Sequence, residues 1–284
     1  MSEHRLDVRK TYKLLINGGF PRSESGRSYK VSSQSGEFLA NVAQGSRKDI
    51  RDAVVAARNA QPKWWALSAY NRGQVIYRMA EMAESRRDEL AEHVRIAEGL
   101  NAREARRSVA AAVDRVVWYA GWTDKFAQIL GSSNPVAGPY FNFSMPVPSG
   151  VVGVIAPQAS SLEGFVNGVL APISVGNTVV VLASEERPTP SVLFGEMTSS
   201  SDVPAGVLNI ITGITGELSP TLAAHEDIDC LDLGDVSSEF ADELALTAAG
   251  SIKRIYRYGN DETMSLRRLR AFVETSTVWH TIGQ

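Results

Sequence analysis

The chain has 284 residues, which is enough for a sizeable hydrophobic core in one large domain or two modest ones. Its formal net charge of −3 gives no reason to expect nucleic acid or an anionic membrane as a partner. No apolar run reaches the roughly 18 residues of a membrane span, and the N-terminus lacks the apolar segment of a signal peptide. Cys230 is the single cysteine. We therefore expect a cytoplasmic protein without a disulfide framework.

The N-terminal part of the chain predicts short strands followed by a series of helices. Residues 12–44 alternate polar and apolar side chains between Gly and Ser breaks, which predicts a small antiparallel layer. Ser46 and Asp49 have the spacing of a reciprocal helix cap. Helices are expected to begin near residues 46, 68, 85 and 102, and the last of them to run to residue 130.

The middle of the chain predicts a strand–helix–strand unit. Residues 151–155 and 178–182 are apolar, β-branched runs typical of strands that are buried on both faces of a parallel sheet. The helical pattern of residues 162–174 lies between them. Before this unit, residues 132–139 are predicted to form a loop, and residues 140–147 alternate like a strand exposed on one face.

Strands and helices go on alternating after this unit. Further strands are predicted at residues 207–211, 228–233 and 252–258, with helices near residues 191–198, 219–225 and 237–249. This alternation is typical of an α/β fold with a doubly wound parallel sheet. The last segment, from Leu266, is predicted to be a short helical piece followed by a strand over residues 272–279.

The whole pattern resembles the aldehyde dehydrogenase superfamily over roughly residues 10–260. The segments that carry the resemblance stand in the family's order: GVIAP, GNTVVV, PAGVLNIITG, HEDID and AGSIKR. The ending FVETSTVW resembles the family's C-terminal oligomerisation strand. Between Gly259 and Leu266 the family would hold a whole catalytic domain, but only a few residues stand there in this chain. The chain is thus similar to the short second module of two-module aldehyde dehydrogenases.

The resemblance implies a Rossmann-like cofactor domain that carries an oligomerisation element and lacks a catalytic domain. On this basis residues 1–131 would be the N-terminal strands and helices of the cofactor-binding domain. Residues 132–150 would form the oligomerisation hairpin, residues 151–262 the Rossmann-like βαβ domain, and residues 263–284 the C-terminal oligomerisation strand.

The family's catalytic roles find no suitable side chain here. The segment that would hold the nucleophilic cysteine is absent, and Cys230 is predicted on a buried strand beside Asp229 and Asp232, whose charges disfavour a thiolate. The position of the oxyanion-stabilising asparagine is Ala159, and that of the general-base glutamate is Arg257, which stays protonated. We therefore expect no catalytic residue. The four histidines show no metal-ligand spacing, so no metal site is expected.

The resemblance places cofactor contacts at two positions, Ile155 and Glu185. Glu185 matches the glutamate that holds the adenosine ribose in the family, but the lysine that should accompany it is Leu182. A single exposed carboxylate is common on protein surfaces. The two positions are therefore interpreted as vestiges of a nucleotide site.

The turns that approach the nucleotide's phosphates in the family are altered. Two of the glycine positions are Thr215 and Ser219, whose side chains stand where backbone would approach the nucleotide. The family's Gly-Ser turn is replaced by Gly234-Asp235-Val236, and its aspartate would repel a phosphate. We expect no firmly bound cofactor, and weak NAD(P) binding is the alternative.

Three functions follow from these observations. The first is a non-catalytic subunit, a pseudoenzyme that supports or regulates a complete NAD(P)-dependent aldehyde dehydrogenase in a hetero-oligomer. Its contacts, or those of a homodimer, would be Tyr140–Val147 and Phe272–Trp279. The second is an NAD(P)-dependent aldehyde dehydrogenase active alone, which every tested residue opposes. The third is a binding module that uses the altered crevice, with Gln158, Ser160 and Glu185 around a polar pocket.

Overall fold

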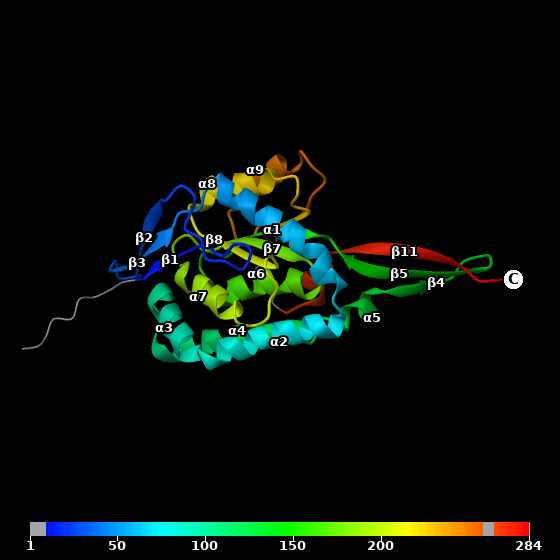
Figure 1. Ribbon diagram of the computed structural model, residues 1–284, viewed down its shortest axis with the longest axis horizontal. Helices are drawn as coiled ribbons and strands as arrows, with labels where there is room; N and C mark the ends of the chain where they lie inside the picture. The colour runs from blue at the N-terminus through cyan, green and yellow to red at the C-terminus, as the bar shows by residue number, and fades with distance from the viewer. Residues whose placement is uncertain (1–9, 258–263, 284) are drawn as a thin grey trace, which may run out of the picture.

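A parallel sheet of five strands forms the centre of the protein, and a long antiparallel arm projects from one end of it (Figure 1). The computed structural model describes residues 10–257 and 264–283. The strand order of the central sheet is β10-β9-β6-β7-β8, and all neighbours are parallel. The five strands are β6 (Val151–Ile155), β7 (Thr178–Leu182), β8 (Leu208–Ile211), β9 (Cys230–Asp232) and β10 (Arg254–Tyr256).

Helices cover both faces of this sheet, which confirms the doubly wound α/β fold (Figure 1). On one face lie α1 (Arg47–Ala66), α8 (Thr215–Ala224) and α9 (Ser238–Ala248). On the other lie α6 (Glu163–Ser174) and α7 (Thr189–Thr198), backed by α2 (Ala69–Ser85), α3 (Arg87–Glu98) and α4 (Ala102–Ala120). Successive side chains of a strand point to opposite faces. Val151 accordingly packs in one core cluster and Val152 in the other.

The N-terminal strands form a separate small sheet in the order β1-β3-β2. They are β1 (Thr11–Tyr12), β2 (Ser28–Ser32) and β3 (Phe38–Ala43). The expectation of an antiparallel layer is correct for β2 and β3, but β1 runs parallel to β3. The predicted cap of α1 is confirmed, because Ser46 Oγ accepts from the Asp49 amide and Asp49 Oδ2 accepts from the Ser46 amide.

Two expectations about residues 102–139 were wrong. The helix predicted to reach residue 130 ends at Ala120, and a separate short helix, α5 (Phe126–Leu130), follows it. The Thr123 hydroxyl donates to the Ala120 carbonyl at 3.0 Å, so a side chain satisfies a helix end where the chain turns away. The predicted loop contains a strand, β4 (Ser132–Asn134), which pairs antiparallel with residues 142–144, and the side-chain Nδ2 of Asn134 also donates to Asn142 Oδ1.

The arm consists of three antiparallel strands in the order β11-β5-β4. β5 (Tyr140–Pro148) pairs with β11 (Val273–Thr281) along the whole length of both strands, so the two predicted oligomerisation segments pair with each other inside one chain. The buried side chain of Asn177 holds both strands at their root. Its Oδ1 accepts from the Gly150 amide at 2.8 Å, and its Nδ2 donates to the Phe272 carbonyl at 2.9 Å.

The chain passes directly from the central sheet to the C-terminal segment, which begins with the short helix α10 (Leu266–Arg270). Only residues 258–263, which lie outside the described residues, stand between Arg257 and Met264, and six residues are far too few for a domain. The Tyr256 hydroxyl donates to the Arg267 carbonyl at 3.2 Å. The end of β10 and the start of the C-terminal segment therefore lie side by side. Within the described residues, no helix combines the length and apolarity that a membrane crossing requires.

Candidate functional site: a bridged crevice at the carboxyl ends of the strands

The loops that follow β6, β7 and β9 meet at the carboxyl edge of the central sheet. Strand order reverses between β6 and β9, and such a switch point is where open α/β sheets bind ligands. Beside the switch point, over the loops that follow β6, β7 and β8, a cavity of about 430 Å³ opens. It is lined by Gln158, Ala159, Glu185, Glu186, Arg187 and Thr215. A second cavity, of about 450 Å³, shares residues 185–187 and extends to β2.

The side chain of Gln158 spans the space between the ends of β6 and β7. Its Nε2 donates to the Ala156 carbonyl at 2.9 Å, and its Oε1 accepts from the Glu185 amide at 2.9 Å. The Gln158 carbonyl accepts from the Ser184 hydroxyl at 3.1 Å. One side chain thus bridges two neighbouring strand ends, a role that the sequence offered no signal to predict.

Glu185 lines the cavity as expected, but its carboxylate is already bonded within the chain. Its Oε2 accepts from the amide of Thr215, the first residue of α8, at 2.8 Å. The free amides of a helix N-terminus carry partial positive charge and attract anions. Burial and the charge of Glu185 together raise the pKa of the nearby Tyr29 hydroxyl. The carboxylate at the family's ribose-binding position, interpreted above as a vestige, therefore stabilises the chain's own helix.

Asp235 lies at the switch point itself. Its Oδ1 accepts from the Gln158 amide at 3.2 Å, which joins the loop after β9 to the loop after β6. The turn depends on Gly234, which has φ +58°, and a Cβ at this glycine would come within 2.3 Å of the Ile155 carbonyl. Asp235, Gln158, Glu185 and Thr215 thus form a continuous chain of hydrogen bonds across the crevice, which we call the crevice bridge.

The remaining predicted positions are distributed as follows. The Ile155 side chain is fully buried in the core, so only its backbone reaches this edge of the sheet. Thr215 Oγ1 and Ser219 Oγ are buried and have no hydrogen-bond partner within the described part of the chain, and these are the side chains that stand at the family's glycine positions. Ser160 does not line the cavity, because its hydroxyl accepts from the Gly164 amide at the start of α6.

The positions tested for catalysis carry other contacts. Ala159 is exposed, and its carbonyl accepts from Arg187 Nη1 at 2.6 Å. Arg257 is exposed and pairs with Asp242 of α9 at 2.5 Å. Cys230 is fully buried, and burial, with a smaller effect from Asp232, raises the pKa of its thiol. Among the described residues, no three His, Cys, Asp or Glu side chains are placed to hold a metal ion.

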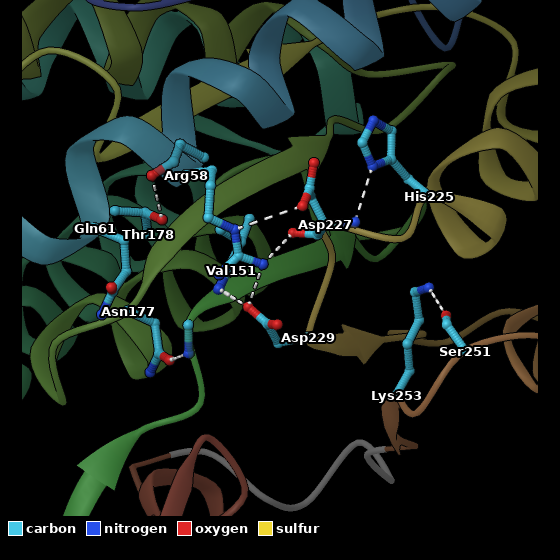
Figure 2. A network of polar contacts seen from close by, with 12 residues as sticks. Arg58, Gln61, Val151, Asn177, Thr178, His225, Asp227, Asp229, Ser251 and Lys253 are labelled. Carbon is cyan, nitrogen blue, oxygen red and sulfur yellow. Dashed lines mark hydrogen bonds and ion pairs between the residues drawn. The ribbon is translucent and has the colours of Figure 1, made fainter.

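A separate polar network lies at the opposite, amino-terminal edge of the sheet, and Figure 2 shows it. Arg58 of α1 donates to Asp229 Oδ2 and to the Asp227 carbonyl, each at 2.7 Å. Asp229 Oδ2 also accepts from the Val151 amide at 2.7 Å. This network ties α1 to the starts of β6 and β9, so Asp229 has a structural role far from the crevice.

The model of the "Aldehyde dehydrogenase family" matches residues 20–257. The chain belongs to the aldehyde dehydrogenase family. It is 32% identical over 249 residues to "Putative aldehyde dehydrogenase DhaS" of Bacillus subtilis. The aligned region covers 86% of this chain and 50% of that protein. It is 33% identical to "Aldehyde dehydrogenase family 2 member B4, mitochondrial" of Arabidopsis thaliana, over 86% of this chain and 45% of that protein.

Solved structures of the family share the fold. The NAD+ complex of an aldehyde dehydrogenase from Bacillus cereus superposes with a TM-score of 0.83 at 27% identity, over 87% of this chain and 50% of that one. An NAD-dependent aldehyde dehydrogenase from Sinorhizobium meliloti gives a TM-score of 0.82 at 26% identity, over 90% of this chain and 51% of that one. This chain therefore spans about half the length of these relatives, and its fold is that of their Rossmann-like cofactor-binding domain.

Proposed function

We propose that this chain is a non-catalytic aldehyde dehydrogenase-like subunit that assembles with a complete NAD(P)-dependent aldehyde dehydrogenase and supports or regulates it. The crevice bridge is the observation that carries this proposal. A phosphate placed at the switch point would meet the carboxylate of Asp235, and at the neighbouring start of α8 the Thr215 amide is already bonded to Glu185, whereas an anion needs free amides. The residues present therefore do not fit a pyrophosphate, and no step of aldehyde oxidation is assigned to them.

The arm supports the assembly half of the proposal. β11 is the outermost strand of the arm, and its free edge presents backbone groups that a strand of another chain can pair with. Side chains along it are open to solvent, including Trp279 at 60% and Val278 at 36% exposure. A complete family member has a further domain that could supply the pairing strand. The single cysteine is buried, and we place the assembly in the cytoplasm.

The test is a tagged pull-down from the native host, with the eluate weighed and assayed for NAD-dependent aldehyde oxidation. We expect a complete aldehyde dehydrogenase to co-elute in fixed ratio with activity. The Val278→Lys variant should lose the partner, because it places a charge on the arm. The Val117→Lys variant is the matched control, since Val117 is equally exposed on α4. Elution of the wild-type chain alone would contradict the proposal.

One observation favours a second candidate, a binding module for a ligand other than a dinucleotide. The two cavities beside the crevice bridge remain open and share a charged wall, Glu185, Glu186 and Arg187. A ligand that binds the folded state raises its apparent stability by mass action. Thermal stabilisation by a mononucleotide, lost in Arg187→Ala, would support this candidate, and an unchanged melting temperature would count against it.

A further inference from the structure

The free edge of β11 is long, and Arg254 covers its root, where it pairs with Glu274 at 2.7 Å and donates to the Val273 carbonyl at 2.5 Å. The strand has nine residues, VETSTVWHT, without proline or lysine, and most of them are exposed. Natural proteins blunt such edges with prolines, charges or bulges, because an unprotected edge pairs with other strands. β5 offers no comparable edge, since β11 covers one of its sides and β4 part of the other.

The sequence of β11 is complementary to itself. When two copies lie antiparallel with Thr277 opposite Thr277, Glu274 of each strand falls opposite His280 of the other. Trp279 then falls opposite Thr275, an aromatic–β-branched pair of the kind that stabilises sheets. No like charges face each other in this register, and each of the nine residues lies opposite a residue of the other strand, with Arg254 already bonded to the Val273 carbonyl at the root. The charge pattern of the edge thus fits a second copy of the same strand.

The faces of the arm fit the same arrangement. The register of β5 with β11 places Phe141, Phe143 and Met145 on one face, beside Val278. Phe141 is 49% and Met145 41% exposed, so this face has an apolar stripe that nothing in the described chain covers. Two arms joined edge to edge would bring their stripes together on one side of a single sheet.

We propose that β11 pairs antiparallel with β11 of a second copy, about a two-fold axis at Thr277, so that the two arms form one six-stranded sheet. The arm projects away from the body and has the C-terminus at its far end (Figure 1). The two bodies then lie at opposite ends of the joined sheet. This pairing does not depend on a complete aldehyde dehydrogenase. A second copy of this chain and a complete aldehyde dehydrogenase would compete for the same edge of β11. Self-pairing would protect that edge until the aldehyde dehydrogenase binds.

A cysteine at the two-fold axis tests the geometry directly on the purified chain. Residues directly opposite in an antiparallel pair have Cβ atoms about 4.5–5.5 Å apart, close to the separation that a disulfide spans. Thr277→Cys should therefore form a disulfide-linked dimer on mild oxidation, while the native Cys230 is buried. Glu274→Cys is the control. Its two copies would stand six residues apart along the strand, about 20 Å, and should not cross-link.

The oligomeric state gives a second readout that needs no new cysteine. The wild-type chain should run as a dimer in size-exclusion chromatography with light scattering. Thr277→Lys places two like charges opposite each other and should weaken the dimer by at least about tenfold. A monomeric wild-type chain, or cross-linking of Thr277→Cys no faster than that of Glu274→Cys, would overturn the proposal. Neither result bears on the heteromeric assembly, because no other protein is present.

Discussion

Asp232 and Arg268 form an ion pair in the interior of the protein. Their side chains are 1% and 6% exposed, and Arg268 Nη2 donates to Asp232 Oδ2 at 2.8 Å. Asp232 Oδ1 accepts from the Gly234 amide, and Arg268 Nε donates to the Asn167 carbonyl. Burial raises the pKa of the Asp232 carboxyl, and the charge of Arg268 opposes that rise. The pair links the turn at the crevice to the helix that leads into the arm.

Removing one partner of this pair should be strongly destabilising. We expect Arg268→Ala to lower the free energy of unfolding by about 3–5 kcal/mol, because it leaves Asp232 buried and uncompensated. Arg257→Ala removes a guanidinium from an exposed pair with Asp242 and should cost less than about 1 kcal/mol. Urea denaturation of the two variants measures the difference. Equal losses would show that burial of the pair has no effect.

His93 makes stability depend on pH. Burial lowers the pKa of its imidazole below the ordinary 6.5, with Lys10 adding to the effect and Glu89 and Glu196 opposing it. The unfolded chain therefore binds the proton more readily, and stability is lost as pH falls from 6.5 through the lowered pKa. His93→Gln should show a flatter dependence of the urea midpoint between about pH 7.5 and pH 5. A variant as acid-sensitive as the wild type would refute this role.

At the scale of residues, the sequence predicts the burial and chemical character of single side chains better than it predicts which residues they contact. The absence of a donor at Ala159 and the burial of Cys230 follow from their places in recognisable motifs. The crevice bridge and the Asp232–Arg268 pair join residues that are between 27 and 77 positions apart in the sequence. No local sequence pattern predicts contacts at such separations. They depend on how the loops after different strands come together at one edge of the sheet.

Among the elements, the arm is held at its root by the buried side-chain amide of Asn177. Asn177 contacts the chain on both sides of the arm root, at Gly150 and at Phe272, and it also donates to the Pro172 carbonyl at 3.0 Å. Arg254 adds a second anchor, since its Nη1 donates to the Ala271 and Val273 carbonyls. The two side chains together tie the root of the arm to the body.

Loss of this amide should loosen the arm more than the body. Asn177→Ala leaves the buried Gly150 amide unpaired, whereas the Pro172 and Phe272 carbonyls keep backbone donors, and it should cost about 1–3 kcal/mol of stability. Hydrogen exchange should increase most at the roots of β5 and β11. Asn71→Ala, at an exposed position of α2, is the control and should stay within about 0.5 kcal/mol of the wild type. Uniform loss of protection over the body and the arm would argue against an anchoring role.

Elements were predictable where hydrophobic periodicity was strong. The strands at residues 151–155 and 178–182 have the predicted bounds, because β-branched runs buried on both faces leave little ambiguity. The break between α4 and α5 and the polar strand β4 were not predictable in the same way. The Thr123 hydroxyl bonds locally to the Ala120 carbonyl, and β4 is fixed by its backbone pairing with β5, so a pattern of hydrophobicity marks neither feature.

On the scale of the whole molecule, the crevice bridge predicts how the chain responds to its family's cofactor. A ligand present at a hundred times its dissociation constant stabilises the folded state by about 2.7 kcal/mol. We expect NAD+ to leave the melting temperature of this chain unchanged under conditions that raise that of a complete family member. Differential scanning fluorimetry of the two proteins side by side measures this. A comparable increase for both would show that a dinucleotide displaces the bridge.

The contact between Tyr256 and Arg267 also bears on how such a chain could arise. Complete relatives are about twice as long, yet here the ends of β10 and α10 lie next to each other. Two chain ends that already meet can be joined by a short loop at little entropic cost. A single in-frame deletion of the intervening domain would then leave the central sheet and the C-terminal segment connected, with their fold intact. Conversely, inserting a relative's catalytic domain between β10 and α10 should give a chimera in which the central five-stranded sheet folds unchanged.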